Sequence, residues 1–313
     1  MPKPIQARPK TDNRKVREKI KFFYLEKFFN KWMNKYDFVG LNYQQKHYIM
    51  KKFWSVGTIA VSSIKSADES LAGLMIDKAI DMKEDSIIFT PWASGGKYNI
   101  YDFPTGVSLI NNRGVKFITP KILEVDKDVV IIYAQKNHKS VFSTIEAKLM
   151  EIIDLEMKKR VSLKAQSQPW MYAFSPEDFD QAKAMQEQME NDEPYMFVSL
   201  YDVDKAKNLT SGAPFIVDKL QALIDGRVNE ILTLLGCNNL GVDEKKEHLV
   251  VDEINANNED VAQSSAGYSD EIREGFERVN SVLGYYVDVI DNNEKFKQDE
   301  QFIDEEGSSD ENI

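Results

Sequence analysis

The strongest helical pattern in this chain lies in residues 213–258, which read APFIVDKLQALIDGRVNEILTLLGCNNLGVDEKKEHLVVDEINANN. On a helical wheel, one continuous arc holds the apolar side chains of Ile216, Val217, Leu220, Leu223, Ile224, Val228, Ile231, Leu234 and Leu235. Polar residues fill the opposite side, so the pattern predicts a helix over residues 213–235 with one buried face. Gly236 is expected to end it as a left-handed cap. The acidic, Asn-rich stretch that follows predicts a long polar loop over residues 237–258.

The composition allows a packed core and argues against several classes of protein. The 313 residues are 42% hydrophobic and include 17 Phe, 13 Tyr and 4 Trp, enough for one large domain or roughly two or three small ones. No apolar run reaches the ~18 residues of a membrane span, and no N-terminal apolar segment indicates secretion. Cys237 is the single cysteine, so no disulfide can form within the chain, which suits a reducing cytosol.

The net charge of −11 conceals opposite charges at the two ends of the chain. Residues 1–52 hold 14 Lys and Arg against 4 acidic residues, whereas residues 292–313 hold 8 acidic residues against 2 Lys. Residues 1–12 also contain three prolines and are expected to form a flexible basic arm, and residues 292–313 a disordered acidic tail. A basic end of this kind either contacts nucleic acid or forms a solvated helix face, and the composition leaves both open.

The first half of the remaining chain predicts helices followed by short strands. Helices are expected at residues 13–35, where Val16, Ile20, Phe23, Phe28 and Trp32 recur at helical spacing, and at residues 42–54. Between residues 56 and 135, short apolar runs separated by Gly, Pro, Asn and Asp predict a small twisted sheet or barrel. These runs are SIIFTPW, KYNIYDF, GVSLI, GVKFI and VVIIYA.

The second half predicts longer helices around a small insert, which makes the fold class α+β. A helix over residues 139–167 would span about 40 Å and end before Pro169; its apolar stripe holds Phe142, Ile145, Leu149, Ile152 and Leu163. The runs PWMYAF and PYMFVSLY predict two strands that flank a short helix. A last helix is expected at residues 259–283, with a break near Gly267, and then a strand at residues 285–290.

No residue set in the sequence predicts catalysis or a metal site. There are only three histidines, and Cys237 has no apparent catalytic partner. Ser94-Gly95-Gly96-Lys97 lacks the first glycine and the Ser or Thr of a phosphate-binding loop, so it predicts a β-turn. The acids and histidine at residues 247–253 match no ligand spacing and are interpreted as a solvated loop. We therefore predict no enzymatic activity, no metal and no cofactor.

The order of residues in the opening segment also resembles that of a known family. The matching positions are Ala213, Pro214, Val217, Asp218, Lys219, Leu220, Asn229, Glu230, Leu235, Gly236, Glu244, Lys245, Lys246, Glu247, Asp252, Glu253, Glu259, Ser264 and Ser265. In this order and spacing, the chain resembles the head-to-tail connector (portal, or upper collar) protein of small short-tailed double-stranded DNA phages. The similarity is strongest over residues 213–290, and weaker but collinear over residues 137–212.

The resemblance implies a portal-protein fold with long stem helices, a small β-barrel-like wing, an α/β clip insert and a tunnel loop, assembled as a ring oligomer. Carried onto this sequence, the parts are the arm at 1–12, the wing at 13–136, stem helices at 137–168 and 204–236, the clip at 169–203, the tunnel loop at 237–258, the wing return (a helix and a strand) at 259–291, and the tail at 292–313.

The resemblance also implies a function. Such a protein forms a dodecameric ring at one capsid vertex of the virion, where the genome is packaged and ejected and the tail attaches; before assembly it lies in the host cytoplasm. The implied partners are further copies of the chain, double-stranded DNA bound without sequence readout, the major capsid protein, the lower collar or tail protein, and the packaging ATPase. A scaffolding protein or a packaging RNA is a further candidate partner, and no membrane is implied.

The candidate DNA-channel residues follow from the same resemblance. They are Asp218, Lys219, Asp225 and Glu230 on the polar side of the helix, and Glu244, Lys245, Lys246, Glu247, Asp252, Glu253, Asn255 and Asn257 in the loop. In a ring, the acids would repel the phosphates of moving DNA, and Lys219, which matches a channel lysine of the family, would make a weak contact. The family's second channel lysine falls here on Thr210, so that ring is missing or has moved to Lys205 or Lys207. Without the resemblance, an ordinary solvated helix face is the favoured interpretation.

Two further groups of charged residues are candidates for contacts with partners. Arg227 lies within the apolar arc, where an unpaired charge is costly, so it is expected to pair with an acid on a neighbouring helix or, by preference, on a neighbouring subunit. The basic residues of the N-terminal arm are Lys3, Arg8, Lys10, Arg14, Lys15 and Arg17. They suit an alternative function, a non-catalytic nucleic-acid-binding protein that uses its basic N-terminal helix, and a hydrolase of unrecognised type is a third hypothesis.

Overall fold

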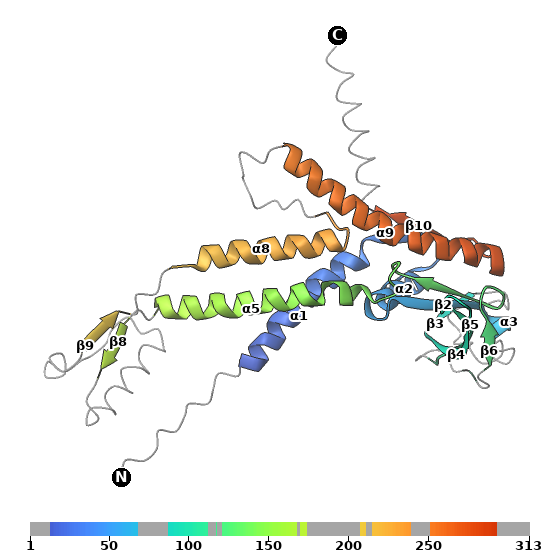
Figure 1. Cartoon of the computed structure of the whole chain (residues 1–313), viewed down its shortest axis with the longest axis horizontal. Coiled ribbons are helices and arrows are strands. Elements are labelled where there is room, and N and C mark those ends of the chain that lie inside the picture. The colour runs from blue at the N-terminus through green and yellow to red at the C-terminus, as the bar shows by residue number, and fades with distance from the viewer. Residues whose placement is uncertain are drawn as a thin grey trace, which may run out of the picture. The chain divides into compact units, whose positions relative to one another are not determined.

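The computed structural model describes residues 13–67, 87–111, 117, 121–167, 170–173, 207–210, 215–238 and 251–292. In chain order its elements are α1 (Asn13–Met33), β1 (Tyr36–Val39), α2 (Tyr43–Ser55), β2 (Thr58–Ser63), α3 (Ile64–Ala67), β3 (Ile87–Thr90), β4 (Trp92–Tyr98), β5 (Pro104–Leu109), β6 (Ile122–Glu124), β7 (Val129–Tyr133), α5 (Val141–Ser167), β8 (Trp170–Ala173), β9 (Lys207–Thr210), α8 (Val217–Leu234), α9 (Val251–Leu283) and β10 (Asp288–Asp291) (Figure 1). The mixture of helices and sheets confirms the predicted α+β class.

The chain divides into two compact units. The helical unit comprises Met1–Ile20 and Met150–Val228, and the sheet unit comprises Lys21–Leu149 and Asn229–Ile313. The boundaries fall inside α1, α5 and α8, so each of these helices contributes residues to both units.

Helix α1 confirms the predicted N-terminal helix but buries a different stripe. Tyr24, Phe28 and Trp32 are its buried residues, spaced four apart as one helix face requires. Phe23, which the periodicity placed on the buried stripe, is 63% exposed. Runs of adjacent aromatic residues such as Phe22-Phe23-Tyr24 do not show from periodicity alone which member faces the core. That choice depends on the elements that pack against the helix.

Helix α2 is also as predicted, and its start is fixed by local chemistry. The side chain of Asn42 accepts a hydrogen bond from the Gln45 amide at 2.9 Å, and the Gln45 side chain accepts one from the Asn42 amide at 3.0 Å. This reciprocal capping box satisfies two amides that the first helical turn leaves without partners. The helix then buries Ile49, Met50, Phe53 and Trp54.

The strands of the sheet unit form two three-stranded antiparallel sheets, in the orders β3-β2-β7 and β4-β5-β6. The small barrel that we predicted is not closed among the described strands, because no described ladder joins the two sheets. The chain passes from β3 to β4 at Pro91, whose ring removes the amide hydrogen that a continuous ladder would need.

Sheet β3-β2-β7 is covered on both faces. Alternate side chains of β7 point to one face of the sheet, where Val129, Ile131 and Tyr133 pack with Val107, Leu109 and Leu123 of the other sheet. Helix α9 packs against β7, and a Cβ atom added to Gly275 would meet Ile132 at 2.6 Å. A strand buried on both faces reads as a continuous apolar run, and this explains why VVIIY is wholly apolar.

The run KYNIYDF, which we expected to form one strand of the sheet, is divided between a strand and a turn. Strand β4 ends at Tyr98, and the Asn99 side chain accepts hydrogen bonds from the amides of Tyr101 and Phe103 at 2.9 and 3.0 Å. Asp102 has a φ of 61°, which fits a turn. An asparagine that hydrogen-bonds its own downstream backbone favours a turn over a strand, and here this local chemistry outweighs the apolar pattern.

A two-stranded sheet joins the two ends of the sheet unit. Strand β10 confirms the strand predicted near residues 285–290 and pairs antiparallel with β1, which we did not predict. Tyr36 faces Asp291 in this register, and Val39 faces Asp288. Four residues that directly follow a helix are too few to show a period of two, so the sequence alone gave no signal for β1.

Helix α5 confirms the predicted long helix, although its buried residues differ. Val141, Ile145, Leu149, Ile152 and Ile153 are buried, whereas Leu163, which we placed on the stripe, is 46% exposed. After α5, strand β8 confirms the strand predicted from PWMYAF, and it pairs with β9 (Lys207–Thr210). The run PYMFVSLY and the short helix expected beside it lie outside the described residues.

Two predicted boundaries around the opening segment were wrong. The stem segment 204–236 is not helical throughout, because it contains β9 and α8 starts only at Val217. The predicted loop 237–258 is too long, because α9 already starts at Val251 and continues past Gly267 without a break. Polar residues such as Asn255 and Asn257 lower helix propensity only slightly, so a long helix tolerates them.

Candidate nucleic-acid interface

Helix α8 separates an exposed polar side from a buried apolar side. Asp218, Lys219 and Asp225 are exposed, as the sequence predicted for the polar side. The buried side is formed by side chains that are each at most 8% exposed: Leu220, Ile224, Val228, Ile231 and Leu235. The helix therefore presents its charges at a surface while apolar contacts fix its orientation.

The predicted apolar arc is wider than the face that the single chain buries. Ile216, Leu223 and Leu234 belong to the arc but are 38%, 53% and 37% exposed. They are about two and three helical turns apart, so they share one side of the helix. We call these three residues the α8 strip.

Polar side chains connect α5 and α8 within the helical unit. Lys159 donates a hydrogen bond to Gln221 Oε1 at 2.9 Å, and Gln221 in turn donates to Asp225 Oδ1 at 2.9 Å. Lys159 also pairs with Glu156 of its own helix at 2.9 Å. Asp225 is thus exposed but held in place by a chain of contacts that starts on α5.

Arg227 has an acidic partner on the neighbouring helix of the same chain. Its Nε lies 2.8 Å from Glu151 Oε2, and the two side chains are 35% and 46% exposed. Of the two partners that we expected for Arg227, an acid on a neighbouring helix or one on a neighbouring subunit, the structure shows the first. Because Glu151 precedes Lys159 while Arg227 follows Gln221, the pairs also show that α5 and α8 run antiparallel (Figure 1).

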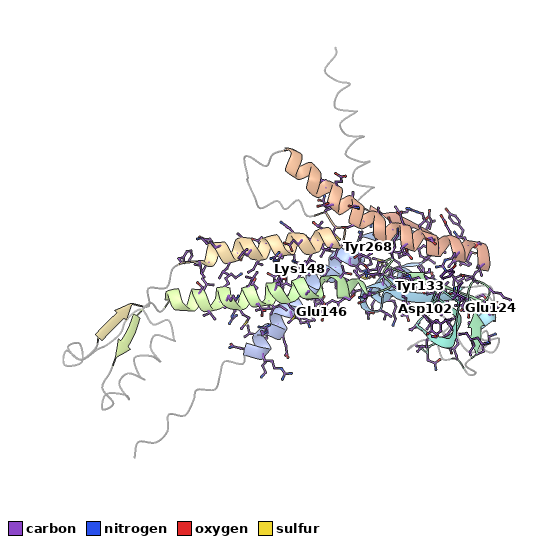
Figure 2. All side chains as sticks on the ribbon, in the orientation of Figure 1. Asp102, Glu124, Tyr133, Glu146, Lys148 and Tyr268 are labelled. Atoms are coloured by element: carbon purple, nitrogen blue, oxygen red, sulfur yellow. The ribbon has the colours of Figure 1, made fainter. Side chains whose placement is uncertain are left out.

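Glu230, the fourth candidate channel residue on this helix, is paired as well. Its Oε2 lies 3.0 Å from Lys148 Nζ of α5, and its side chain is 44% exposed. Figure 2 labels Lys148 on α5, on the side that faces α8. A carboxylate in such a pair repels phosphate less than a solvated one does, so the polar side of α8 carries less free negative charge than the sequence suggested.

The loop candidates divide between undescribed and helical residues. Glu244, Lys245, Lys246 and Glu247 lie outside the described residues. Asp252, Glu253, Asn255 and Asn257 lie in the first turns of α9. No Lys or Arg occurs between Val251 and Ile272, whereas Glu259 and Asp260 add two exposed acids. The first part of α9 is therefore an acidic helix.

The end of α8 is fixed by a predicted glycine cap. Gly236 has a φ of 62°, its amide donates to the Thr233 carbonyl at 2.9 Å, and the Cys237 amide donates to the Leu232 carbonyl at 2.8 Å. These two hydrogen bonds form a Schellman motif, which satisfies carbonyls at the end of the helix. The motif confirms the cap that the sequence predicted at Gly236.

A buried lysine that the sequence did not reveal completes this end of α8. Lys35 is 3% exposed, and its Nζ donates to the Leu235 carbonyl at 2.7 Å. The ammonium also lies 4.9 Å from the ring centroid of Tyr36 and 5.1 Å from that of Tyr268. A cation between two aromatic faces and a helix C-terminal carbonyl is stabilised by all three.

The groups around Lys35 are hydrogen-bonded to one another. Tyr36 donates to the Ser265 carbonyl at 3.1 Å, Tyr268 donates to the Leu234 carbonyl at 3.2 Å, and the Ser265 hydroxyl donates to the Asp291 carboxylate. We call this group the junction, comprising Trp32, Lys35, Tyr36, Gly236, Cys237, Ser265, Tyr268 and Asp291. It joins α1, β1, the end of α8, α9 and β10, and its members Gly236 and Cys237 come shortly before residues 239–250 in the chain.

Burial shifts the titration of the junction. It lowers the pKa of Lys35 from 10.5 to about 8, although the nearby Cys237 and Asp291 act in the opposite direction. Burial also raises the pKa of Tyr268 to about 12 and raises the pKa of Tyr36 and Cys237. The junction therefore disfavours charge on each of these groups, as a site withdrawn from water does.

No sequence signal pointed to Lys35. A lysine just after a helix that ends near residue 33 is normally solvated, and apart from the adjacent Tyr36 the groups around it, Leu235, Tyr268 and Asp291, are at least 200 residues away in the chain. Only the packing of distant elements brings them together. By contrast, Gly236 was detectable because a helix ending in glycine has a local pattern.

The basic residues at the N-terminus are described only in part. Lys3, Arg8 and Lys10 lie outside the described residues. Arg14 pairs with Glu18 one turn along α1 at 3.2 Å, and Arg17 pairs with Asp154 of α5 at 2.7 Å. Lys15 is exposed on the same helix. Arg14 and Arg17 thus take part in ion pairs within the chain.

The described residues give no sign of a metal site or a membrane span. In the parts of the chain that the structure describes, no three His, Cys, Asp or Glu side chains are grouped to hold a metal ion. Among the described helices, none combines the length and apolarity needed to cross a membrane.

Comparison with known proteins gives the family. The sequence profile of the Phage Connector (GP10) family matches residues 9–297. Three solved structures align over most of the chain. A chain from the portal and tail of native bacteriophage P68 has a TM-score of 0.44 at 13% identity and covers 95% of each chain. An HK97 family phage portal protein from Corynebacterium diphtheriae has a TM-score of 0.43 at 9% identity and covers 91% of this chain and 97% of its own.

The third structure is a chain from the virion of a native gene transfer agent particle, with a TM-score of 0.44, 10% identity, and coverage of 94% of this chain and 87% of its own. The family profile extends well beyond residues 213–290, where the sequence resemblance was strongest, and spans both units. The chain belongs to the phage connector family, whose members are portal proteins.

Proposed function

We propose that the chain assembles into a dodecameric ring at one vertex of a phage capsid, where it is the channel for genome packaging and ejection and the attachment site for the tail. The observation that carries this proposal is the division of α8 into an exposed charged side and the α8 strip. The strip needs an apolar partner, and a neighbouring copy supplies the same surface at every position of a ring. The charged side then lines the channel.

The exposed apolar surface extends to the neighbouring helix. Within the helical unit, Met150, Val161 and Leu163 of α5 are 39%, 66% and 46% exposed. Single exposed apolar residues are common on monomers, but an apolar strip along one helix with further exposed residues on the helix beside it is typical of a subunit interface. Arg227 lies between the buried side and the strip on the helical wheel, so its pair with Glu151 would stand at the edge of this interface.

The charges suit a channel that lets DNA slide. Asp218 and Asp225 on α8 and the acidic first part of α9 would face phosphates with repeated negative charge, which prevents adhesion. Lys219 would add one ring of weak, sequence-independent phosphate contacts. Residues 239–250 follow the glycine cap of α8 at Gly236. We assign this segment, which includes Glu244, Lys245, Lys246 and Glu247, to the part of the chain that meets DNA.

The remaining parts of the function follow from this placement. The ring acts without catalysis of its own and binds the major capsid protein, the lower collar or tail protein and the packaging ATPase, with a scaffolding protein or packaging RNA as a further partner. It would reside in the virion after assembly in the host cytoplasm. The domain assignment to wing, stem, clip and tunnel loop is part of this proposal.

The oligomeric state tests the ring. The purified chain should have a native mass about twelve times its 36.0 kDa. Leu223→Asn should shift the mass toward the monomer while the far-ultraviolet circular dichroism stays unchanged, because Leu223 is half-exposed in the single chain. Leu163→Asn on α5 tests the second helix of the same proposed interface, and it should also shift the native mass toward the monomer. A monomer or dimer of the unaltered chain would overturn the ring and favour the alternative, a nucleic-acid-binding protein that uses α1.

The channel is tested separately in assembled particles. Lys219→Ala should change the amount of DNA packaged or retained, whereas Lys97→Ala, an exposed lysine on β4, should not. A Lys219→Ala particle that packages and retains its genome normally would remove this role. Deleting residues 240–250 should reduce retention of the packaged genome without preventing ring formation.

A further inference from the structure

A cavity of about 460 Å³ lies within the sheet unit and has no role in the proposed channel. It is bordered by the β4–β5 turn, by β6 and β7, and by the second half of α9. Glu124 and Tyr133, which both line it, are labelled in Figure 2 on the β-rich part of the chain. All of its lining residues are described and belong to one unit.

One wall of the cavity is aromatic. The ring of His138 stacks on that of Tyr133 with centroids 3.8 Å apart and an angle of 17° between the planes. Phe103 meets the same histidine edge-on at 5.5 Å and is 46% exposed. His138 has a φ of 58°, a conformation that places its ring between the two others at some cost in backbone energy. His138 therefore contacts both of the other rings, and the three form the aromatic part of the cavity lining.

The lining is also acidic. Glu124, Asp126, Glu271 and Glu274 line the cavity, and Arg278 is the only Lys or Arg among its lining residues. Arg278 is engaged by Asp126 at 3.2 Å and donates to the Ile131 carbonyl at 2.7 Å, so its charge is largely offset. Burial raises the pKa of the Tyr133 hydroxyl; Arg278 opposes this shift, while Asp126 and Glu271 add to it. Glu271 and Glu274 on α9 leave the cavity with an excess of negative charge.

Aromatic walls beside carboxylates recognise a particular kind of ligand. Prolines of an extended segment pack on aromatic rings, because the polyproline conformation exposes flat apolar rings at little cost in entropy. Lysine and arginine side chains extend along the same rings by cation–π contact and end at carboxylates. The ligand class is therefore an extended peptide that alternates proline with basic residues.

This chain contains such a segment at its own N-terminus. Residues 2–10 read PKPIQARPK, with prolines at positions 2, 4 and 9 and basic residues at positions 3, 8 and 10, and no acid. The charges of the segment and the cavity are opposite in sign. Prolines also restrict its backbone before binding, which reduces the entropy lost when it docks.

We propose that the cavity is the docking site for residues 2–10 of a second copy of this chain. The arm would then fasten neighbouring copies to each other at a place distinct from the α8 strip. The inference rests on the proposed association of copies, and it assigns the basic arm a protein partner in place of nucleic acid.

A photo-crosslinker tests the site in the intact assembly. Full-length chain with p-benzoylphenylalanine in place of Ala7 is mixed, before assembly, with isotopically heavy chain that lacks the crosslinker, then irradiated, digested and analysed by mass spectrometry. Light–heavy crosslinks should fall in residues 99–105, 124–138 or 271–278. Crosslinks elsewhere, or only within one chain, would overturn the proposal.

Charge reversal supplies the control. Glu271→Lys with Glu274→Lys should lower the crosslink yield about fivefold or more, and Lys3→Glu, Arg8→Glu and Lys10→Glu together should restore it. Glu277→Lys, an exposed acid on the same helix outside the cavity, should leave the yield unchanged. If the double charge reversal disturbs folding, Glu274→Gln and a salt titration of the unaltered chain replace it. A crosslink yield that neither Glu274→Gln nor added salt lowers would overturn the proposal.

The native mass of the same samples separates this inference from the proposed ring. An assembly of the expected mass without light–heavy crosslinks would refute the docking site and leave the ring intact. A monomeric sample would refute the ring, and with it the association of copies on which the docking site depends.

Discussion

The junction and the α5–α8 helix pair both join distant parts of the chain through polar side chains, but they differ in their exposure to water. At the junction, Lys35 and Asp291 are each 3% exposed; Lys35 lies against two aromatic rings and a carbonyl, and Asp291 accepts a hydrogen bond from the Ser265 hydroxyl. Along the helix pair, Arg227 and Glu151 keep 35% and 46% of their side-chain surface exposed. Buried polar groups fix one geometry, because every alternative leaves them unpaired, whereas half-exposed pairs exchange readily with water.

The same contrast applies to apolar packing. In the sheet unit, β7 is covered on both faces and Phe28, Trp32, Tyr36 and Phe276 are at most 1% exposed. On α8, the strip of Ile216, Leu223 and Leu234 remains partly exposed. One region completes its core within a single chain, and the other leaves apolar surface exposed, which we propose is a subunit interface. Mutations in the two regions should therefore differ in whether they affect folding or assembly.

The largest effect on folding is expected from Trp32→Ala in the junction. Trp32 is fully buried, its Nε1 donates to the Met50 carbonyl at 3.1 Å, and its ring meets those of Tyr36 and Tyr268 edge-on. The void that the missing side chain leaves and the loss of its hydrogen bond should lower the free energy of unfolding by about 3–5 kcal/mol, measured by denaturant titration. Phe22→Ala on the same helix, at a residue 65% exposed, should change it by less than about 0.5 kcal/mol. Equal losses from both variants would contradict the contrast.

A smaller effect, specific to the junction, is expected on raising the pH. The pKa of Lys35 is about 8 in the folded chain, against an ordinary value of 10.5 that applies to the unfolded chain. Between pH 8 and pH 10.5 the unfolded chain therefore binds more protons than the folded chain. The free energy of unfolding should therefore rise with pH across this window, by about 1 kcal/mol between pH 7 and pH 9.

The contribution of Lys35 is isolated by comparing the chain with Lys35→Met. Cys237, Tyr36 and Tyr268 act in the opposite direction at higher pH, because their raised pKa values make the unfolded chain lose those protons first. Tyr36 and Tyr268 are common to both proteins and cancel in the difference. Because Lys35 itself lowers the pKa of Cys237, both proteins carry Cys237→Ser, which removes that contribution. A difference that stays flat from pH 7 to pH 9 would show that Lys35 is not titrating in the folded junction.

The smallest effect is expected from Arg227→Ala in the helix pair. A half-exposed ion pair contributes little, so the free energy of unfolding should fall by less than about 1 kcal/mol. A double-mutant cycle with Glu151→Ala measures the coupling, which should shrink further in high salt. A loss of several kcal/mol in the isolated chain would show that this pair stabilises the fold as strongly as the junction does.

The sequence predicted the helices better than their surroundings. It gave α1, α2, α5 and α8, and the cap at Gly236, because helical periodicity and capping are local. It also identified the connector family from the order of residues around α8. It placed Phe23 and Leu163 on buried stripes wrongly, because the width of a buried face depends on what packs against it.

The candidate site was predictable in part for the same reason. Asp218, Lys219 and Asp225 are exposed as expected, but the partners of Arg227 and Glu230 come from α5, whose register against α8 is a property of the packed pair. Among the described strands, the separation of the two sheets was also not predictable, because it depends on which strands pair with each other and on which of them α9 covers. Nothing in a one-dimensional pattern separates two stacked sheets from a closed barrel when the strands are equally short.

By itself, then, the sequence determined which segments are helical, where α8 ends, the polarity of its two sides and the family to which the chain belongs. These depend on interactions among residues within a few turns of one another or on residue order alone. Only the tertiary structure decided that Lys35 is buried at the end of α8, that Arg227 is paired within the chain, and that a cavity with an aromatic and an acidic wall lies in the sheet unit. Each of these requires residues far apart in the chain to meet, and the free energy that brings them together comes from packing and not from local propensity.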